Sequence, residues 1–510
     1  MTDSSVRGRL TRAPLPGLVW LRTLALAGLI LSCLACVWVL ETRFQGLEVE
    51  TLEIAETPVT VYRMAQEAQR PLVVMAHGFG GSRQMMDQLA VSLARQGMAV
   101  ASLDLPGHGR NTARLSPDIT RIDGTTAQLV QVVDRVTDAL MLRSDSLGPV
   151  SFVGHSMATD VVIRAAQARS DVNGVVAISM YSPAVTERSP QALLVLSGAT
   201  ESHLRAAGLD AVRLIDPDAL EGQTIAQGDV VRRTAVAPWV GHVGVLYSRT
   251  SLDETTRWLR DVTGQGLQAR LDQTGWIAGI LLVCLVALGW PLARILPQRR
   301  ITSPELSRGS FVLSITAPIP AVLLVAALPT FGIAGQAAFG SLAAILGLWG
   351  GVQLLILWRA GVTVVRPDII GLLAFLGYGL GVFALALDRY GAAFLPVGPR
   401  FPVMLGLLLG TVPAMMADTI LVQGASWRRR LLARVALLTG LAGAMALSPS
   451  ELGLTFTTLP VLVLFFVVYG SLARWIAERR GAGSVALGKG LVLAWAFAAS
   501  TPLFAVAALP

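Results

Sequence analysis

Long apolar runs divide the chain into three parts. One run covers residues 23–40, and the others all follow residue 274. About 20 apolar residues in a helix cross the ~30 Å hydrocarbon core of a bilayer. The pattern therefore predicts a membrane anchor over residues 23–40, an extramembrane domain over residues 41–273, and a polytopic membrane domain of about eight helices over residues 274–510.

Basic residues are distributed unevenly around these runs. We predict nine spans, at residues 23–40, 275–296, 311–330, 334–358, 369–387, 401–423, 431–447, 455–473 and 485–509. If residues 1–22 form a basic cytoplasmic N-terminus, the cytoplasmic segments hold 18 Arg and Lys residues, Lys489 included, and the opposite loops hold 2, Arg389 and Arg400. Positively charged loops stay in the cytoplasm. The extramembrane domain and the C-terminus are therefore predicted to lie outside the cytoplasm.

The composition narrows the possible functions. The net charge of +8 does not indicate nucleic-acid binding, because most of the excess Arg lies between apolar runs. Lys489 is the only lysine among 41 basic residues, which favours a GC-rich bacterial source and hence a plasma-membrane protein. The three cysteines, Cys33, Cys36 and Cys284, all lie in apolar runs, so the extramembrane domain has neither a disulfide nor a thiolate metal site.

Asp418 is an ionisable residue inside a predicted span, which makes it a candidate functional residue. Its position near the cytoplasmic end of the span favours a helix-interface or snorkelling acid instead. We predict no metal, cofactor or internal repeat, and the scarcity of buried charge argues against a proton-coupled transporter.

Within residues 41–273, short apolar runs alternate with helical stretches. Runs rich in β-branched residues occur at 71–76, 99–103, 150–153, 174–179, 192–196 and 230–236. Strands that alternate with helices in this way form a parallel sheet covered on both faces. The domain is therefore predicted to be a doubly wound, mostly parallel α/β fold.

The segment Gly154-His155-Ser156-Met157-Ala158 lies between a predicted strand and a predicted helix. It matches the nucleophile elbow G-x-S-x-G, with Ala158 in place of the last glycine. The sharp strand-to-helix turn of an elbow exposes the serine hydroxyl above the sheet. Ser156 is therefore the predicted nucleophile.

A glycine-rich turn, His77-Gly78-Phe79-Gly80-Gly81, ends the strand at 71–76. Acyl transfer needs two N–H donors that converge on the developing oxyanion, and glycines let backbone approach it closely. We predict that the N–H groups of Phe79 and Met157 form this oxyanion hole.

Five histidines limit the choice of a base. His77, His108 and His155 belong to turns, which leaves His203 and His242; His242 is favoured because glycines flank it in a loop after the strand at 230–236. The acid should lie between nucleophile and base in the chain. Glu201, just past the strand at 192–196, is favoured over the remaining carboxylates Asp210, Asp216, Asp218 and Glu221.

These motifs, together with Asp104-Leu105-Pro106-Gly107-His108-Gly109, resemble the α/β-hydrolase superfamily over residues 47–264. The resemblance implies an eight-stranded sheet, a Ser-acid-His triad, and structural roles for Asp104 and His108 in the turn at the site rim. A glutamate replaces the commoner aspartate. About a dozen residues separate the strands at 174–179 and 192–196, so a minimal lid and an open site are expected. Residues 274–510 resemble no family.

The resemblance and the motifs together predict a membrane-anchored serine hydrolase. It would cleave an ester, thioester or amide through an acyl-enzyme, with a small or lipid-like acyl substrate, and a carboxylic ester is favoured. Two alternatives stay open: an acyltransferase with the same triad, and a transporter or receptor whose hydrolase-like domain only binds a ligand.

Overall fold

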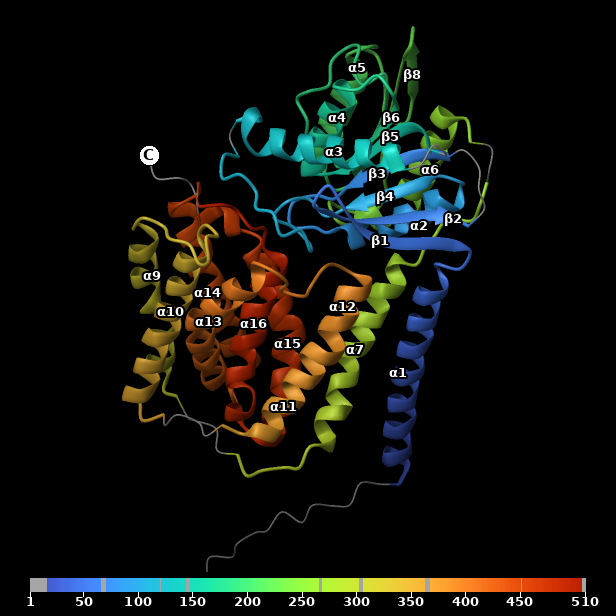
Figure 1. Cartoon of the computed structure of the whole chain (residues 1–510). Helices are drawn as coiled ribbons and strands as arrows, with labels where there is room; N and C mark the ends of the chain where they lie inside the picture. The colour runs from blue at the N-terminus through green and yellow to red at the C-terminus, as the bar shows by residue number, and fades with distance from the viewer. Residues whose placement is uncertain are drawn as a thin grey trace, which may run out of the picture.

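The computed structural model describes residues 16–65, 70–119, 121–143, 147–265, 268–301, 306–362, 367–450 and 452–506. Most of the predicted cytoplasmic N-terminus, residues 1–15, lies outside them. A sheet domain stands over one end of a bundle of helices, and two helices that lie side by side, α1 (Pro16–Thr42) and α7 (Gly275–Ile295), lead into and out of it (Figure 1).

The sheet has nine strands in the order β1-β2-β4-β3-β5-β6-β7-β9-β8. Strands β3 to β7 and β9 run parallel to one another, while β1, β2 and β8 add antiparallel pairs toward the edges. The strands are β1 (Leu47–Ile54), β2 (Thr57–Met64), β3 (Arg70–Ala76), β4 (Ala99–Leu103), β5 (Leu147–His155), β6 (Val172–Ile178), β7 (Ala192–Gly198), β8 (Thr224–Gln227) and β9 (Val230–Ala237).

The strand count differs from the eight that the resemblance implied. The short strand β8 forms a hairpin with β9 around Gly228, whose φ of +59° favours glycine. The apolar pattern also missed β1, because most of its side chains are exposed at the sheet edge.

Helices cover both faces of the sheet. Val74 and Val195 point to the face packed by α3 (Ala127–Arg143), α4 (Met157–Gln167) and α5 (Ser202–Arg213). Their neighbours Val73 and Leu196 point to the face packed by α2 (Asp87–Arg95) and α6 (Arg249–Thr263). Successive side chains of a strand alternate between faces, so a strand buried on both sides is apolar throughout. The predicted doubly wound, mostly parallel fold is confirmed.

The second half of the chain is helical. Among the described residues, eight helical segments are long and apolar enough to cross a membrane. Besides α1 and α7, the helices are α8 (Arg308–Thr316), α9 (Pro318–Ala326), α10 (Phe339–Arg359), α11 (Ile369–Tyr378), α12 (Leu385–Tyr390), α13 (Arg400–Val422), α14 (Trp427–Leu447), α15 (Thr458–Arg480) and α16 (Ala486–Ser500). Helices α8 and α9 form one segment, as do α11 and α12 with a π-helical turn, Gly379–Ala384, between them.

The last predicted span, residues 485–509, is shorter than expected. Helix α16 has 15 residues and ends at Ser500. The chain then runs along the sheet domain, where Leu503 N–H donates to Gly107 O at 3.0 Å and Ala505 N–H donates to Leu115 O at 2.9 Å. The end of the described chain therefore lies on the same side of the bundle as the sheet domain.

The three basic residues singled out by the charge pattern occupy different positions. Arg389 and Arg400 lie at the end of the bundle next to the sheet domain, where Arg389 pairs with Glu41 at 2.8 Å. Lys489, counted above with the cytoplasmic segments, instead lies within α16, 1% exposed, in an ion pair with Asp418 of α13. Lys489 therefore belongs to a helix that begins three residues before it, and it does not count toward the charge of a cytoplasmic segment.

Candidate active site

Ser156 lies at the sharp turn between β5 and α4. Its φ of 52° and ψ of −119° are sparsely populated by residues with a side chain, and strain of this kind occurs at functional sites. A Cβ at Gly154 would lie 2.6 Å from the carbonyl oxygen of Ala158, so the elbow needs glycine there. Ala158 is the second residue of α4, and its methyl group is accommodated there, fully buried.

His242 lies in the loop that follows β9, and the fold brings it to Ser156. Its Nε2 is 2.8 Å from Ser156 Oγ, and its Nδ1 is 2.6 Å from Glu201 Oε1. The alternative candidate for the base, His203, lies exposed on α5. One continuous chain of hydrogen bonds therefore joins the hydroxyl, the imidazole and the carboxylate.

Glu201 follows the end of β7, and its side chain is largely buried. Besides the imidazole, its carboxylate accepts hydrogen bonds from Gly198 N–H at 2.6 Å and from Ser179 Oγ at 2.8 Å. Burial raises the pKa of Glu201, but these three hydrogen bonds outweigh burial and leave the pKa below its usual value. The carboxylate is therefore charged near neutral pH and oriented toward His242.

The other carboxylates considered for the acid have different surroundings. Glu221 pairs with Arg205 at 2.8 Å, and Asp216 accepts the N–H of Asp218 at 3.0 Å. Asp210 is exposed on α5. Of the five candidates, Glu201 is the one that the fold brings to His242.

The two predicted oxyanion donors lie on either side of the nucleophile. Met157 begins α4, and Phe79 lies in the turn after β3. Within the described part of the chain, neither backbone N–H has a hydrogen-bond acceptor. A Cβ at Gly78 would lie 2.9 Å from Ser156 Cβ, which shows how closely the glycine turn approaches the nucleophile.

A cavity of about 150 Å³ opens beside Ser156, lined by residues that include Gly78, Phe79, His242 and Leu246. The His242 side chain is 47% exposed, and residues 179–191 form no helix over the site. The site is therefore open to solvent on this side. No group of three or more metal-ligating side chains occurs among residues that the structure describes.

His155, which the sequence gave no reason to single out, supports the loop of the base. Its Nε2–H donates to the carbonyl oxygen of His242 at 2.8 Å. Burial lowers the pKa of His155 to about 4, and burial also lowers the pKa values of His77 and His108. All three imidazoles are therefore neutral at pH 7 and hold their loops by hydrogen bonds to backbone groups.

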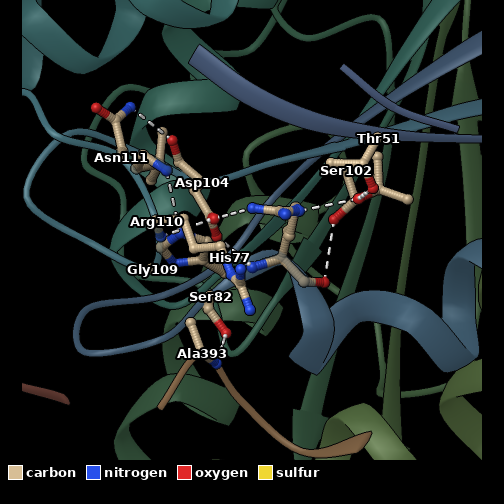
Figure 2. Close-up of polar contacts among 12 residues, drawn as sticks. Thr51, His77, Ser82, Ser102, Asp104, Gly109, Arg110, Asn111 and Ala393 are labelled. Atoms are coloured by element: carbon tan, nitrogen blue, oxygen red, sulfur yellow. Dashed lines mark hydrogen bonds and ion pairs between the residues drawn. The ribbon is translucent and has the colours of Figure 1, made fainter. Parts of the chain in front are cut away.

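The Asp104 turn closes the rim of the site, as the resemblance implied. The fully buried carboxylate pairs with Arg83 and accepts the N–H groups of Arg83 at 2.8 Å and Arg110 at 3.0 Å. Figure 2 shows Asp104 surrounded by Gly109, Arg110 and Asn111, with Ser82 facing Ala393. The last contact, from Ala393 N–H to Ser82 Oγ at 3.0 Å, joins the end of the glycine-rich turn to the chain after α12.

The helical second half of the chain, called the membrane region below because its helices are long and apolar enough to cross a membrane, also contacts the glycine-rich turn that holds Phe79. The ring of Phe456, just before α15, stacks on Phe79 with centroids 5.4 Å apart and planes 9° apart, and Phe504 packs against Phe79 at 6.1 Å. Sequence reasoning missed both phenylalanines, because nothing in an apolar run marks the side chain that will contact another domain.

Comparison with known proteins found matches to the sheet domain. The family model for serine aminopeptidases of the S33 type matches residues 67–223. This segment is part of an α/β-hydrolase domain. A search of curated proteins found no match to the chain.

Solved structures similar to the hydrolase domain have low sequence identity. One is a predicted CIB-like hydrolase from Thermoplasma acidophilum, at 17% identity and a TM-score of 0.34, covering 42% of this chain and 98% of that one. A dienelactone hydrolase from Anabaena variabilis is 18% identical with a TM-score of 0.33, covering 44% and 98%. A bacterial membrane phospholipase A is 16% identical with a TM-score of 0.31, covering 48% and 97%.

Proposed function

We propose that the hydrolase domain is a membrane-anchored serine hydrolase that cleaves an ester, thioester or amide bond, with a carboxylic ester as the favoured substrate. The observation that carries this proposal is the hydrogen-bond chain from Ser156 through His242 to Glu201, at 2.8 and 2.6 Å. A nucleophile, a base and an orienting carboxylate in this order are what acyl-enzyme chemistry requires.

The reaction would begin with attack of Ser156 Oγ on the substrate carbonyl carbon, while His242 Nε2 takes the hydroxyl proton. The N–H groups of Phe79 and Met157 would donate to the oxyanion, and Glu201 would stabilise the imidazolium. Collapse of the tetrahedral intermediate breaks the bond to the leaving group, which receives the proton from His242. Water, deprotonated by the same imidazole, then releases the acid and restores Ser156.

Labelling with a fluorophosphonate probe tests the proposal. Wild-type protein in the membrane fraction should be labelled, and Ser156→Ala should abolish labelling and hydrolysis of a p-nitrophenyl ester. Ser170→Ala, an exposed serine between α4 and β6, is the matched control and should be labelled like wild type. A folded wild-type protein that does not react would argue for a domain that only binds its ligand.

The proposed location is the outer side of the plasma membrane. It is supported by the charge asymmetry, 17 to 2 basic residues once the buried Lys489 is left out, and by the common side of the hydrolase domain, Arg389 and Arg400. In a bacterial host, alkaline phosphatase fused after Gly264 should be active, and the same reporter fused after Arg300 should be inactive. The reverse pattern would place the hydrolase domain in the cytoplasm.

A further inference from the structure

A second cavity, of about 530 Å³, lies at the end of the membrane region remote from the hydrolase domain. Its walls come from α13, α14, α15 and α16, near the last residues of α13 and α15 and the first turns of α14 and α16. A volume of this size is within the range of ligand sites, roughly 300–1,000 Å³. The cavity is separate from Ser156, which lies beyond the opposite ends of these helices.

Cations outnumber carboxylates in this cavity. Arg430, Arg434, Arg474 and Lys489 line it, whereas the nearby acids are Asp418 and Glu478. Lys489 is satisfied by its ion pair with Asp418, and Arg474 lies 3.9 Å from Glu478. Two positive charges therefore remain without a matching carboxylate.

The unmatched charges belong to Arg430 and Arg434 of α14. The nearest carboxylate to Arg434 is 3.9 Å away and already bound to Lys489, and the Arg434 Nε is buried without a hydrogen-bond partner. Across the described ranges, Arg430 has no ion pair. A buried donor without an acceptor is costly, so a ligand that supplies acceptors here would be stabilised.

The surroundings hold the Arg434 guanidinium in place before any ligand binds. It lies over the ring of Phe466, 4.6 Å from the centroid. It also fits against the backbone of α15 at Gly470, where a Cβ would lie 3.1 Å from Nη2. A preformed donor loses little conformational entropy on binding.

The remaining wall is apolar and continuous with helices that are long and apolar enough to cross a membrane. Val422, Ala473 and Val485 contribute to it. Basic pockets between membrane helices bind lipid headgroups, and arginine matches the geometry of phosphate oxygens. We propose that this cavity binds the phosphate of an anionic headgroup, with Arg430 and Arg434 as the donors.

Binding to the purified full-length protein in detergent tests the proposal, with native mass spectrometry as the measurement. Phosphatidylglycerol should bind more tightly than zwitterionic phosphatidylcholine. Arg430→Gln and Arg434→Gln should each weaken phosphatidylglycerol binding about tenfold or more, because each removes a charge-assisted hydrogen bond. Arg428→Gln is the matched control, since Arg428 lies on the same turn over Trp427 and does not line the cavity.

Competition with inorganic phosphate identifies the source of the anion. If millimolar phosphate displaces the lipid, and Arg430→Gln reduces phosphate binding, the anion site stands and also accepts soluble phosphate. The proposal is overturned if both cavity variants bind phosphatidylglycerol as tightly as the wild type does. It is also overturned if Arg428→Gln weakens phosphatidylglycerol binding as much as the cavity variants do. Arg430→Gln keeps the test informative if Arg434→Gln misfolds, because Arg430 forms no ion pair with any residue that the structure describes. Ester hydrolysis reports on the proposed active site at Ser156, so the result of that assay does not decide whether this cavity binds an anion.

Discussion

The hydrolase domain and the membrane region bury polar side chains in different ways. In the hydrolase domain, buried imidazoles and carboxylates gather at one edge of the sheet, where β3, β4, β5 and β7 end, as His77, Asp104, His155 and Glu201 show. In the membrane region, buried charges lie toward helix ends: Asp368 pairs with Arg480 and Asp418 with Lys489. Arg400 instead donates to backbone carbonyl oxygens. The carboxyl ends of parallel strands lie at the same edge of a sheet, so polar residues that follow the strands come together there. Helices in an apolar environment tolerate a charged side chain only where the charge is neutralised or lies close to water.

The difference shows what each region contributes at their contact. The hydrolase domain supplies the groups suited to chemistry, and the membrane region supplies support for the turns that carry them. Arg400 of α13, 2% exposed, donates to the carbonyl oxygens of Gly107 and Gly109 in the Asp104 turn, and Phe456 stacks on Phe79. The proposed active site is therefore sensitive to changes in both regions.

The largest expected effect is within the hydrolase domain. Glu201→Gln should lower turnover of a p-nitrophenyl ester roughly 10⁴-fold, because the imidazolium loses its charged partner. Glu221→Gln, which removes a carboxylate paired with Arg205, is the matched control and should stay near wild type. If instead Glu201→Gln keeps its turnover while Asp216→Asn or Asp218→Asn loses it, the acid is a different residue.

The next effect tests the contact between the regions. Arg400→Met leaves the carbonyl oxygens of Gly109, Ala498 and Thr501 without this donor, and should destabilise the protein by about 3 kcal/mol or more. The measurement is the Tm in detergent. Arg389→Met breaks an exposed pair with Glu41 and should change stability by less than about 1 kcal/mol. Equal Tm values for the two variants would show that the Arg400 contacts do not hold the regions together.

Acid should destabilise the hydrolase domain through its buried imidazoles. His155 has a pKa of about 4 in the folded protein against 6.5 when unfolded, so the unfolded chain binds more protons between these values. Stability should therefore fall as the pH falls from about 6.5 to about 4, by roughly 3 kcal/mol for this residue. His155→Gln should reduce the drop in Tm between pH 7.5 and pH 5; an unchanged drop would assign the acid sensitivity to other groups.

The smallest effect concerns the stacked pair between the regions. Phe456→Ala should lower kcat by about fivefold with little change in KM, because loss of a stacking contact worth about 1 kcal/mol loosens the turn that carries the Phe79 N–H. Phe401→Ala, at an exposed position on α13, is the control. Were KM alone to rise, Phe456 would act on substrate binding and not on the oxyanion donor.

Sequence patterns located the chemistry of the hydrolase domain more completely than that of the membrane region. Strand ends and glycine turns are local features, so Ser156, Phe79 and the loop of His242 could be selected from short segments. Their catalytic roles stay predictions. The ion pair between Asp418 and Lys489 could not be foreseen, since the two residues are 71 positions apart and charge counting placed Lys489 with the cytoplasmic segments.

The sequence by itself determined the alternation of strands and helices, the apolar spans and the elbow, because each depends on the periodicity or the glycines of a few neighbouring residues. Only the tertiary structure decided that Glu201 meets His242, 41 positions further along, that Phe456 supports Phe79, and that a basic cavity opens among α13 to α16. These features arise where distant segments pack together, and the geometry of packing is a property of the whole fold rather than of any segment.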